Sequence, residues 1–137
     1  MRKSLTRSLN LSDMGLFRMT IGVESLVKRG QVIEVPDTLV DTGSEFTWIP
    51  RAILESLGVG VERARRFIVA DGRRIEREIG YAIIHACGTA GIDYVVFGEE
   101  SDFAILGAHS LEGLNLRVDP VKKQLVDAGP IPAVAAA

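Results

Sequence analysis

Short strand-like runs separated by turn residues constrain the fold more than any other feature of this sequence. The runs are rich in β-branched and aromatic residues, and Gly, Pro and Asp residues separate them. They cover residues 16–23, 31–35, 38–40, 65–70, 73–87, 92–97, 103–106 and 116–126. They predict about eight short strands, and an Asp119-Pro120 turn is expected within the last run. Because no strand–helix–strand alternation is sustained, we expect an all-β fold, closed or sandwiched, and no parallel α/β sheet.

Two short segments are predicted to be helical. Pro50 fits a first helical position, the next apolar residues fall on one side, and Gly58 fits just past the end. Residues 107–114 have room for one or two further turns. Helices this short are marginal alone, so packing must hold them.

The composition is that of one globular domain. Of 137 residues, 47% are hydrophobic and 25% charged, and the net charge is −2. We therefore expect neither nucleic acid nor an anionic membrane as a partner. The basic start has no apolar stretch after it and no run approaches a membrane span, which predicts a cytoplasmic protein. We divide the chain into a loose polar leader (1–15), the domain (16–128) and a flexible tail (129–137).

The cysteine and histidine content argues against a disulfide or a metal site. Cys87 is the only cysteine, and its apolar run predicts a small buried core residue. The only histidines, His85 and His109, are far apart in sequence and are predicted to be structural. We expect no metal and no cofactor.

One segment carries recognisable chemistry. An apolar run enters Asp41-Thr42-Gly43-Ser44, and apolar residues including Phe46 follow. Gly43 allows close backbone approach, and the two hydroxyls can hold the turn. The tripeptide alone is more often an ordinary turn, so its surroundings must decide. Phe46 and the nearby Trp48 are predicted to belong to the core.

Those surroundings supply a resemblance. The apolar flanks of Asp41, the Asp71-Gly72 hairpin signal and the later Ile105-Leu106-Gly107 segment before a helix occur in an order that resembles the retroviral-type aspartic proteases. The resemblance covers residues from about 16 to 126. It implies a closed acid-protease-type β barrel with one or two short helices and one lobe per subunit.

The resemblance also implies roles for residues. Asp41 would be catalytic, Thr42 would bond across a dimer, and Ser44 would support the carboxylate, with Gly43 between them. Ile105, Leu106 and Gly107 would pack against the Asp41 turn. A flap over the substrate would include Ile68, Val69, Ala70, Asp71, Gly72 and Arg73.

The chemistry of this family requires two carboxylates. Two carboxylates a few ångströms apart share one proton, and the pair activates water to attack a peptide carbonyl. The chain holds one Asp-Thr-Gly, so the second must come from another copy, most simply as a homodimer. The resemblance then implies an aspartic endopeptidase that cuts an extended peptide or unfolded protein bound as an added strand.

Two features of the sequence depart from the family pattern or imitate its motif. The flap region has only Gly72 at its tip and carries many charges, with six arginines at Arg63, Arg65, Arg66, Arg73, Arg74 and Arg77. We interpret them as a solvated face, the alternatives being a preference for acidic substrates or a weak nucleic-acid contact. Asp127-Ala128-Gly129 imitates the Asp41 motif but lacks the hydroxyl, and is predicted to close a strand.

The rival hypothesis is a non-catalytic dimeric peptide-binding module of the same fold, which keeps the Asp turn for structure. A third option is a processing domain of a longer precursor.

Overall fold

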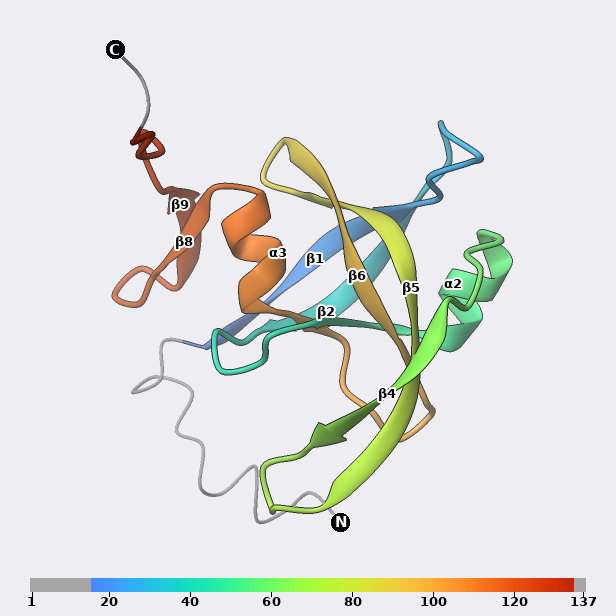
Figure 1. Ribbon diagram of the computed structural model, residues 1–137. Helices are drawn as coiled ribbons and strands as arrows, with labels where there is room; N and C mark the ends of the chain where they lie inside the picture. The colour runs from blue at the N-terminus through green and yellow to red at the C-terminus, as the bar shows by residue number, and fades with distance from the viewer. Residues whose placement is uncertain (1–15, 135–137) are drawn as a thin grey trace.

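The computed structural model describes residues 16–134, and strands dominate it (Figure 1). The strands are β1 (Phe17–Glu24), β2 (Val32–Val40), β3 (Thr47–Pro50), β4 (Arg63–Ile68), β5 (Arg74–Ala86), β6 (Thr89–Gly98), β7 (Ile105–Leu106), β8 (Leu116–Asp119) and β9 (Gln124–Asp127). The helices are α2 (Arg51–Ser56) and α3 (Ala108–Gly113). The predicted all-β class with two short helices is confirmed.

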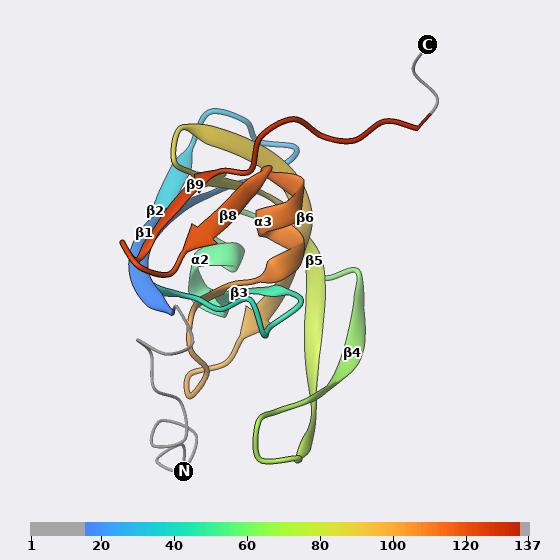
Figure 2. The ribbon, with the colours of Figure 1, turned by 90° about the vertical axis from the view of Figure 1, so that its left-hand side faces the viewer.

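Seven strands form one sheet that closes on itself. Its order is β1-β2-β7-β3-β6-β5-β4, and β1 also pairs with β5. The pairings from β1 through β2, β7, β3, β6 and β5 therefore make a closed ring, while β4 lies outside it on β5. β8 and β9 form a separate two-stranded sheet beside α3 (Figure 2).

The interior of the ring is the main core. Val23, Val35, Ile84 and Phe97 are among its fully buried side chains, and Leu54 joins it from α2. Each such side chain contributes about 1.5–3 kcal/mol by leaving water. This burial explains how a six-residue helix persists, because Leu54 holds α2 against the ring.

The hairpin and helix signals of the sequence are largely confirmed. Gly30 between β1 and β2 has φ = 105° and Gly72 between β4 and β5 has φ = 89°, values that favour glycine. Gly58 follows α2 with φ = 75°. Pro50, predicted as the first helical residue, instead precedes the helix as its cap residue.

The predicted break between residues 31–35 and 38–40 is wrong, because β2 is one strand. Met19 pairs with Thr38 and Ile21 with Val35, so Pro36 and Asp37 together face one residue of β1. This is a β-bulge, where a proline without an N–H is tolerated. Asp37 has φ = 51° there.

The prediction that Cys87 is buried is also wrong. Cys87 is exposed, and with Gly88 it forms the two-residue turn between β5 and β6. Both residues have positive φ (53° and 76°), as the turns that suit a two-residue hairpin require. The turn takes the last residue of the apolar run out of the core.

The leader prediction (1–15) lies outside the described residues, as do residues 135–137. Residues 131–134 are exposed and belong to no strand or helix. Within residues 16–134, the helices are too short and too polar to cross a membrane.

A buried carboxylate holds the β1–β2 hairpin to β5. Glu24 Oε2 accepts hydrogen bonds from the Gly30 amide (2.7 Å) and Arg29 Nε (3.0 Å). Glu24 Oε1 lies 2.8 Å from His85 Nε2, which gives His85 a structural contact. The Gly30 amide first, then His85 and Arg29, lower the pKa of Glu24 from its usual 4.5 to about 2.

This lowered pKa predicts acid sensitivity. A carboxyl with a lower pKa in the folded state stabilises the fold above pH 4.5, and this contribution is lost as pH falls towards about 2. We expect Glu24→Gln to be less stable than the parent at pH 7, with the difference shrinking between pH 4.5 and 2. Urea midpoints across pH measure this. Glu34→Gln, on the exposed side of β2, is the control. A difference independent of pH would contradict the assignment.

Candidate active site

The Asp41 carboxylate lies in a tight turn between β2 and β3. Asp41 Oδ1 accepts a hydrogen bond from the Gly43 amide (2.8 Å), and the Ser44 amide donates to the Asp41 carbonyl (3.1 Å). Asp41 is partly exposed, and Thr42 and Gly43 are exposed. The carboxylate is thus oriented by the backbone of its own turn while staying accessible to solvent.

β7 lies between the two arms of this turn. Leu39 and Val40 of β2 pair in parallel with Ile105 and Leu106, and Trp48 of β3 pairs with Ile105 on the other side. The Asp41 amide itself donates to the Leu106 carbonyl (3.1 Å). Ladder bonds on both sides therefore fix where the turn begins and ends.

Gly107 brings the start of α3 against the turn. A Cβ at Gly107 would lie 2.4 Å from the Phe46 carbonyl oxygen and 2.8 Å from that of Ser44, which leaves room for glycine alone. The amides of Ala108 and His109 donate to the carbonyls of Ser44 (2.7 Å) and Glu45 (3.0 Å). The turn thus supplies acceptors for amides that a helix start leaves unpaired.

The structure thus brings Asp41, Thr42, Gly43 and Ser44 together with Ile105, Leu106 and Gly107. The Ser44 hydroxyl, predicted to support the carboxylate, donates to the Phe46 carbonyl instead (2.9 Å). Because a hydroxyl has one hydrogen, it holds the shape of the turn in this single chain. The roles assigned to these residues stay predictions.

A buried series of hydrogen bonds holds the Gly107 amide in place. The Gly107 amide donates to Thr47 Oγ1 (3.0 Å), Thr47 Oγ1 lies 2.5 Å from Ser110 Oγ, and Ser110 Oγ donates to Asp93 Oδ2 (2.5 Å). Since Ser110 gives its one hydrogen to Asp93, Thr47 must donate to Ser110. The chain therefore runs in one direction, from the Gly107 amide to a carboxylate.

Asp93 ends this chain as a buried carboxylate. Its Oδ1 accepts from the Tyr94 amide (2.7 Å) and lies 2.5 Å from His109 Nδ1, which gives His109 a structural contact. Sequence reasoning missed Asp93, Thr47 and Ser110. The available signal was an acidic residue inside the apolar run of β6, where it is buried while its neighbour Ile92 is exposed.

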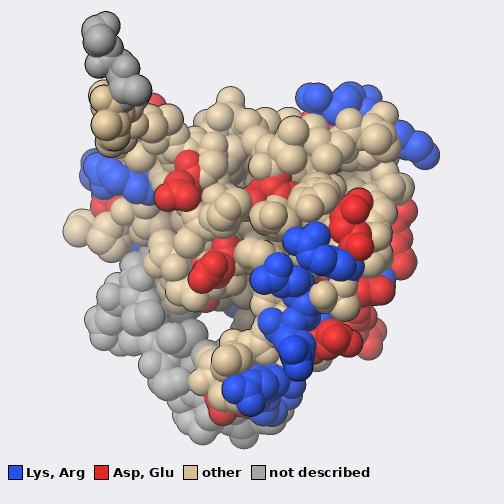
Figure 3. Space-filling view, in the orientation of Figure 1, with Lys and Arg blue, Asp and Glu red and all other residues tan. Residues whose placement is uncertain are grey.

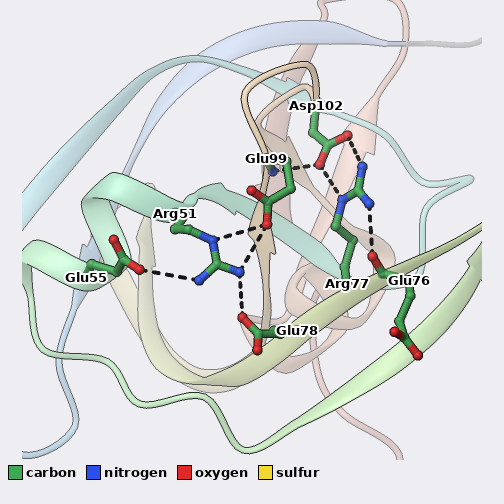
Figure 4. Close-up of polar contacts among 7 residues, drawn as sticks. All are labelled: Arg51, Glu55, Glu76, Arg77, Glu78, Glu99 and Asp102. Atoms are coloured by element: carbon green, nitrogen blue, oxygen red, sulfur yellow. Dashed lines mark hydrogen bonds and ion pairs between the residues drawn. The ribbon is translucent and has the colours of Figure 1, made fainter.

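Ion pairs hold the loop that leads into β7 (Figure 4). Arg77 binds Asp102 through two nitrogens (2.7 and 3.0 Å), and the Glu99 amide donates to the same carboxylate (2.7 Å). Arg51 contacts Glu99 and two further carboxylates, those of Glu55 and Glu78. Hydrogen bonding to Asp102 raises the pKa of Arg77, and bonding to Glu78 first and Glu99 next raises that of Arg51.

The predicted flap is the β4–β5 hairpin, which extends beyond the ring (Figures 1 and 2). Backbone hydrogen bonds hold its tip: the Val69 amide donates to the Arg73 carbonyl, and the Gly72 amide donates to the Val69 carbonyl. Asp71 pairs with Arg73 at 2.7 Å, and the Arg73 amide and guanidinium lower the pKa of Asp71. Ile68 and Ala70 are exposed.

An aromatic cluster joins the base of this hairpin to the Asp41 turn. The Phe67 ring of β4 lies 5.8 Å from Phe46 and 5.2 Å from Trp48, between centroids. Phe46 stacks on Tyr94 of β6 at 5.2 Å. Trp48 is buried and Phe46 partly so, in line with the core placement expected of both. The hairpin and the arm of the turn therefore share one apolar surface.

A shallow hollow of about 340 Å³ lies beside the turn. Thr42 contributes to its rim, and the remaining lining comes from α3 and the β8–β9 sheet: Ala108, Leu111, Glu112, Asn115, Leu116, Arg117, Val118 and Ala128. Among residues 16–134, His, Cys, Asp and Glu are nowhere grouped in threes as a metal site would need.

Two solved structures are similar to this chain. The protease of simian foamy virus (mac) shares 14% identity, with a TM-score of 0.47 over 70% of this chain and 92% of that one. The retroviral protease-like domain of Ddi1 from Leishmania major shares 17% identity, with a TM-score of 0.47 over 87% and 98%. No protein-family model matches the sequence, and no curated protein matches it significantly.

The hydrogen-bond chain below Gly107 predicts a cost for removing its centre. Thr47→Val leaves the buried Gly107 amide without an acceptor, so we expect a loss of about 1–3 kcal/mol of unfolding free energy in urea titrations. Thr89→Val on β6 is the control, because it makes the same change at a hydroxyl that has no hydrogen-bond partner among the described residues. Equal stability of the two variants would contradict the role of Thr47.

Proposed function

We propose that this chain is one subunit of a homodimeric aspartic endopeptidase, in which two copies of Asp41 activate water. The observation that carries the proposal is the Asp41 carboxylate, which is held in place by its turn and β7 yet remains accessible. Within residues 16–134 no Lys, Arg or His is paired with it, so its charge is not committed to a structural ion pair.

Two such carboxylates supply the chemistry without a cofactor. The ionised member takes a proton from water as the oxygen attacks the peptide carbonyl, and the protonated member donates to the carbonyl oxygen. The tetrahedral diol then collapses as a proton passes to the amide nitrogen and the C–N bond breaks. The products are a carboxylic acid and an amine, and the pair again holds one proton.

The sequence holds one Asp-Thr-Gly, and the nearest imitation of it, at Asp127, is a poor source of the second carboxylate. Asp127 ends β9 as predicted, is exposed, and accepts from the Gly129 amide (2.7 Å) and Asn115 Nδ2 (3.4 Å). Its turn has no counterpart of β7. The hollow beside Thr42, with apolar Leu111 and Val118 in its lining, is the surface that a second copy would cover.

We infer the substrate class from the exposed turn and the projecting hairpin. A peptide in extended form can pass between the Asp41 turn and the β4–β5 hairpin, with alternate side chains on the aromatic cluster. The hairpin would close over it and exclude water. Unfolded protein or a flexible peptide meets this requirement, whereas a folded surface does not.

Substitution of Asp41 tests the mechanism. We expect the parent to cleave denatured protein between pH 4 and 7 and Asp41→Asn to lose at least about 1,000-fold, because an amide cannot accept the proton of water. Asp127→Asn is a matched control, since Asp127 also accepts the amide of the glycine two residues on. It should keep parental activity.

The same experiment distinguishes the rival. If the parent and Asp41→Asn are folded and dimeric, bind peptides equally and cleave nothing, the chain is a peptide-binding module and the proposal fails. Cleavage that survives Asp41→Asn would also overturn it.

Dilution tests the need for two copies. A monomer holds half a site, so specific activity should fall roughly in proportion to concentration well below the dimer dissociation constant. Activity assays across a dilution series, read beside analytical ultracentrifugation, measure both quantities. Constant specific activity on a monomeric sample would contradict a shared site.

A further inference from the structure

The side of β4 that faces the aromatic cluster carries two arginines. Side chains alternate along a strand, so Arg63, Arg65 and Phe67 share one face. Phe67 packs on Phe46 and Trp48, which places this face towards the arm of the Asp41 turn. The two arginines therefore border the same surface along which a substrate would lie.

Both guanidinium groups lie over aromatic rings. Arg65 Cζ is 6.0 Å from the centroid of Phe46, and Arg63 Cζ is 5.9 Å from that of Tyr94. These two rings are themselves stacked. Hydrogen bonding to Tyr81 raises the pKa of Arg63. The rings position the cations at the edge of the cluster while leaving their charge in place.

No carboxylate neutralises these two cations within the described part of the chain. Arg65 lies directly opposite Arg77, and like charges in that position destabilise a strand pair. Arg77 is compensated because it binds Asp102, whereas Arg65 has no ion-pair partner among residues 16–134. The fold thus keeps an uncompensated positive charge beside the candidate site.

The basic side chains gather on this hairpin. Figure 3 shows Lys and Arg side chains following β4 and β5 and continuing onto the body of the molecule, with acidic side chains to one side. The gathering is local, since the net charge of the chain is −2. A local positive wall fits a ligand with one or two negative charges better than a polyanion.

We propose that Arg63 and Arg65 form an anion-binding wall of the substrate groove, which selects peptides with an acidic side chain near the scissile bond. This inference rests on the proposed endopeptidase function. A carboxylate fits the planar fork of a guanidinium with two hydrogen bonds, and a closed hairpin strengthens them by excluding water. In a two-fold dimer the wall occurs twice, so acidic residues are preferred on both sides of the cleaved bond.

A peptide explains the surface better than nucleic acid does. Glu62, Glu76 and Glu78 are interleaved with the arginines along this hairpin, so its charge is mixed, which suits a phosphate backbone poorly. The rings beneath the guanidinium groups are already stacked on one another, which leaves them less suited to stacking bases.

A peptide series tests the inference. A neutral peptide that the parent cleaves is resynthesised with a single Glu, or a single Gln, at each of several positions on either side of the cut. We expect the Glu peptide to have about three- to ten-fold higher kcat/KM than the Gln peptide at one or more positions on each side. The ratio should fall towards one as salt is raised.

Variants locate the effect. Arg65→Gln should bring the Glu-to-Gln ratio close to one, Arg65→Lys should keep part of it, and Arg65→Glu should favour a Lys peptide. Arg66→Gln is the matched control, because Arg66 makes the same charge change on the opposite face of β4. It should leave the ratio as in the parent. Circular dichroism checks that each variant is folded.

The outcomes separate this inference from the function on which it rests. A ratio of one at every position, with the neutral peptide still cleaved, would overturn the inference and leave the endopeptidase intact. Equal loss of preference in Arg65→Gln and Arg66→Gln would also overturn it, as would tight binding of a single-stranded RNA oligonucleotide that Arg65→Gln abolishes while the peptide ratio stays unchanged. Failure to cleave any peptide would instead count against the proposed function.

Discussion

The insertion of β7 between β2 and β3 is the contact on which the rest of the structure depends. In the ring, β2 and β3 are joined only through Ile105 and Leu106. These two residues therefore close the ring and, by the same ladder bonds, hold the Asp41 turn at its entrance and exit. Fold closure and the placement of the Asp41 carboxylate are consequences of one pairing.

A strand of two residues cannot hold itself in place, so the segments on either side of β7 must be fixed. Before it, Asp102 is bound by Arg77 and by the Glu99 amide. After it, Gly107 packs against the carbonyls of the turn, and its amide begins the buried chain that ends at Asp93. Burying a carboxylate is costly, and it is tolerated here because three hydrogen-bonding groups, from Tyr94, His109 and Ser110, contact it.

The sequence predicts those parts of the fold that depend on local signals. The hairpins at Gly30 and Gly72 and the end of α2 at Gly58 follow from glycine conformations, which are local. The bulge at Pro36 was misread as a turn because the distinction lies in the partner strand. Cys87 was placed in the core because its run is apolar, yet the register of β5 with β6 assigns it to a two-residue turn.

The candidate site was predictable only where a motif carries it. Asp41-Thr42-Gly43 and Ile105-Leu106-Gly107 are recognisable as short sequence motifs, and the structure places them in contact. The series of hydrogen bonds from Thr47 through Ser110 to Asp93 joins three segments far apart in sequence, so no local sequence pattern reveals it. The same is true of Arg77, whose partner Asp102 lies on the loop before β7.

Ion pairing also distinguishes some arginines on and near the hairpin from others, which the sequence alone does not do. Arg51 and Arg77 bind carboxylates and hold the loop before β7, so their charges are paired within the fold. Arg63 and Arg65 meet aromatic rings and no carboxylate within the described residues, although Arg65 faces another arginine across the strands. A chain selected for stability alone gains nothing from a positive charge in that position. A charge that the fold does not use is best explained, under the proposed function, by the peptide that would lie beside it.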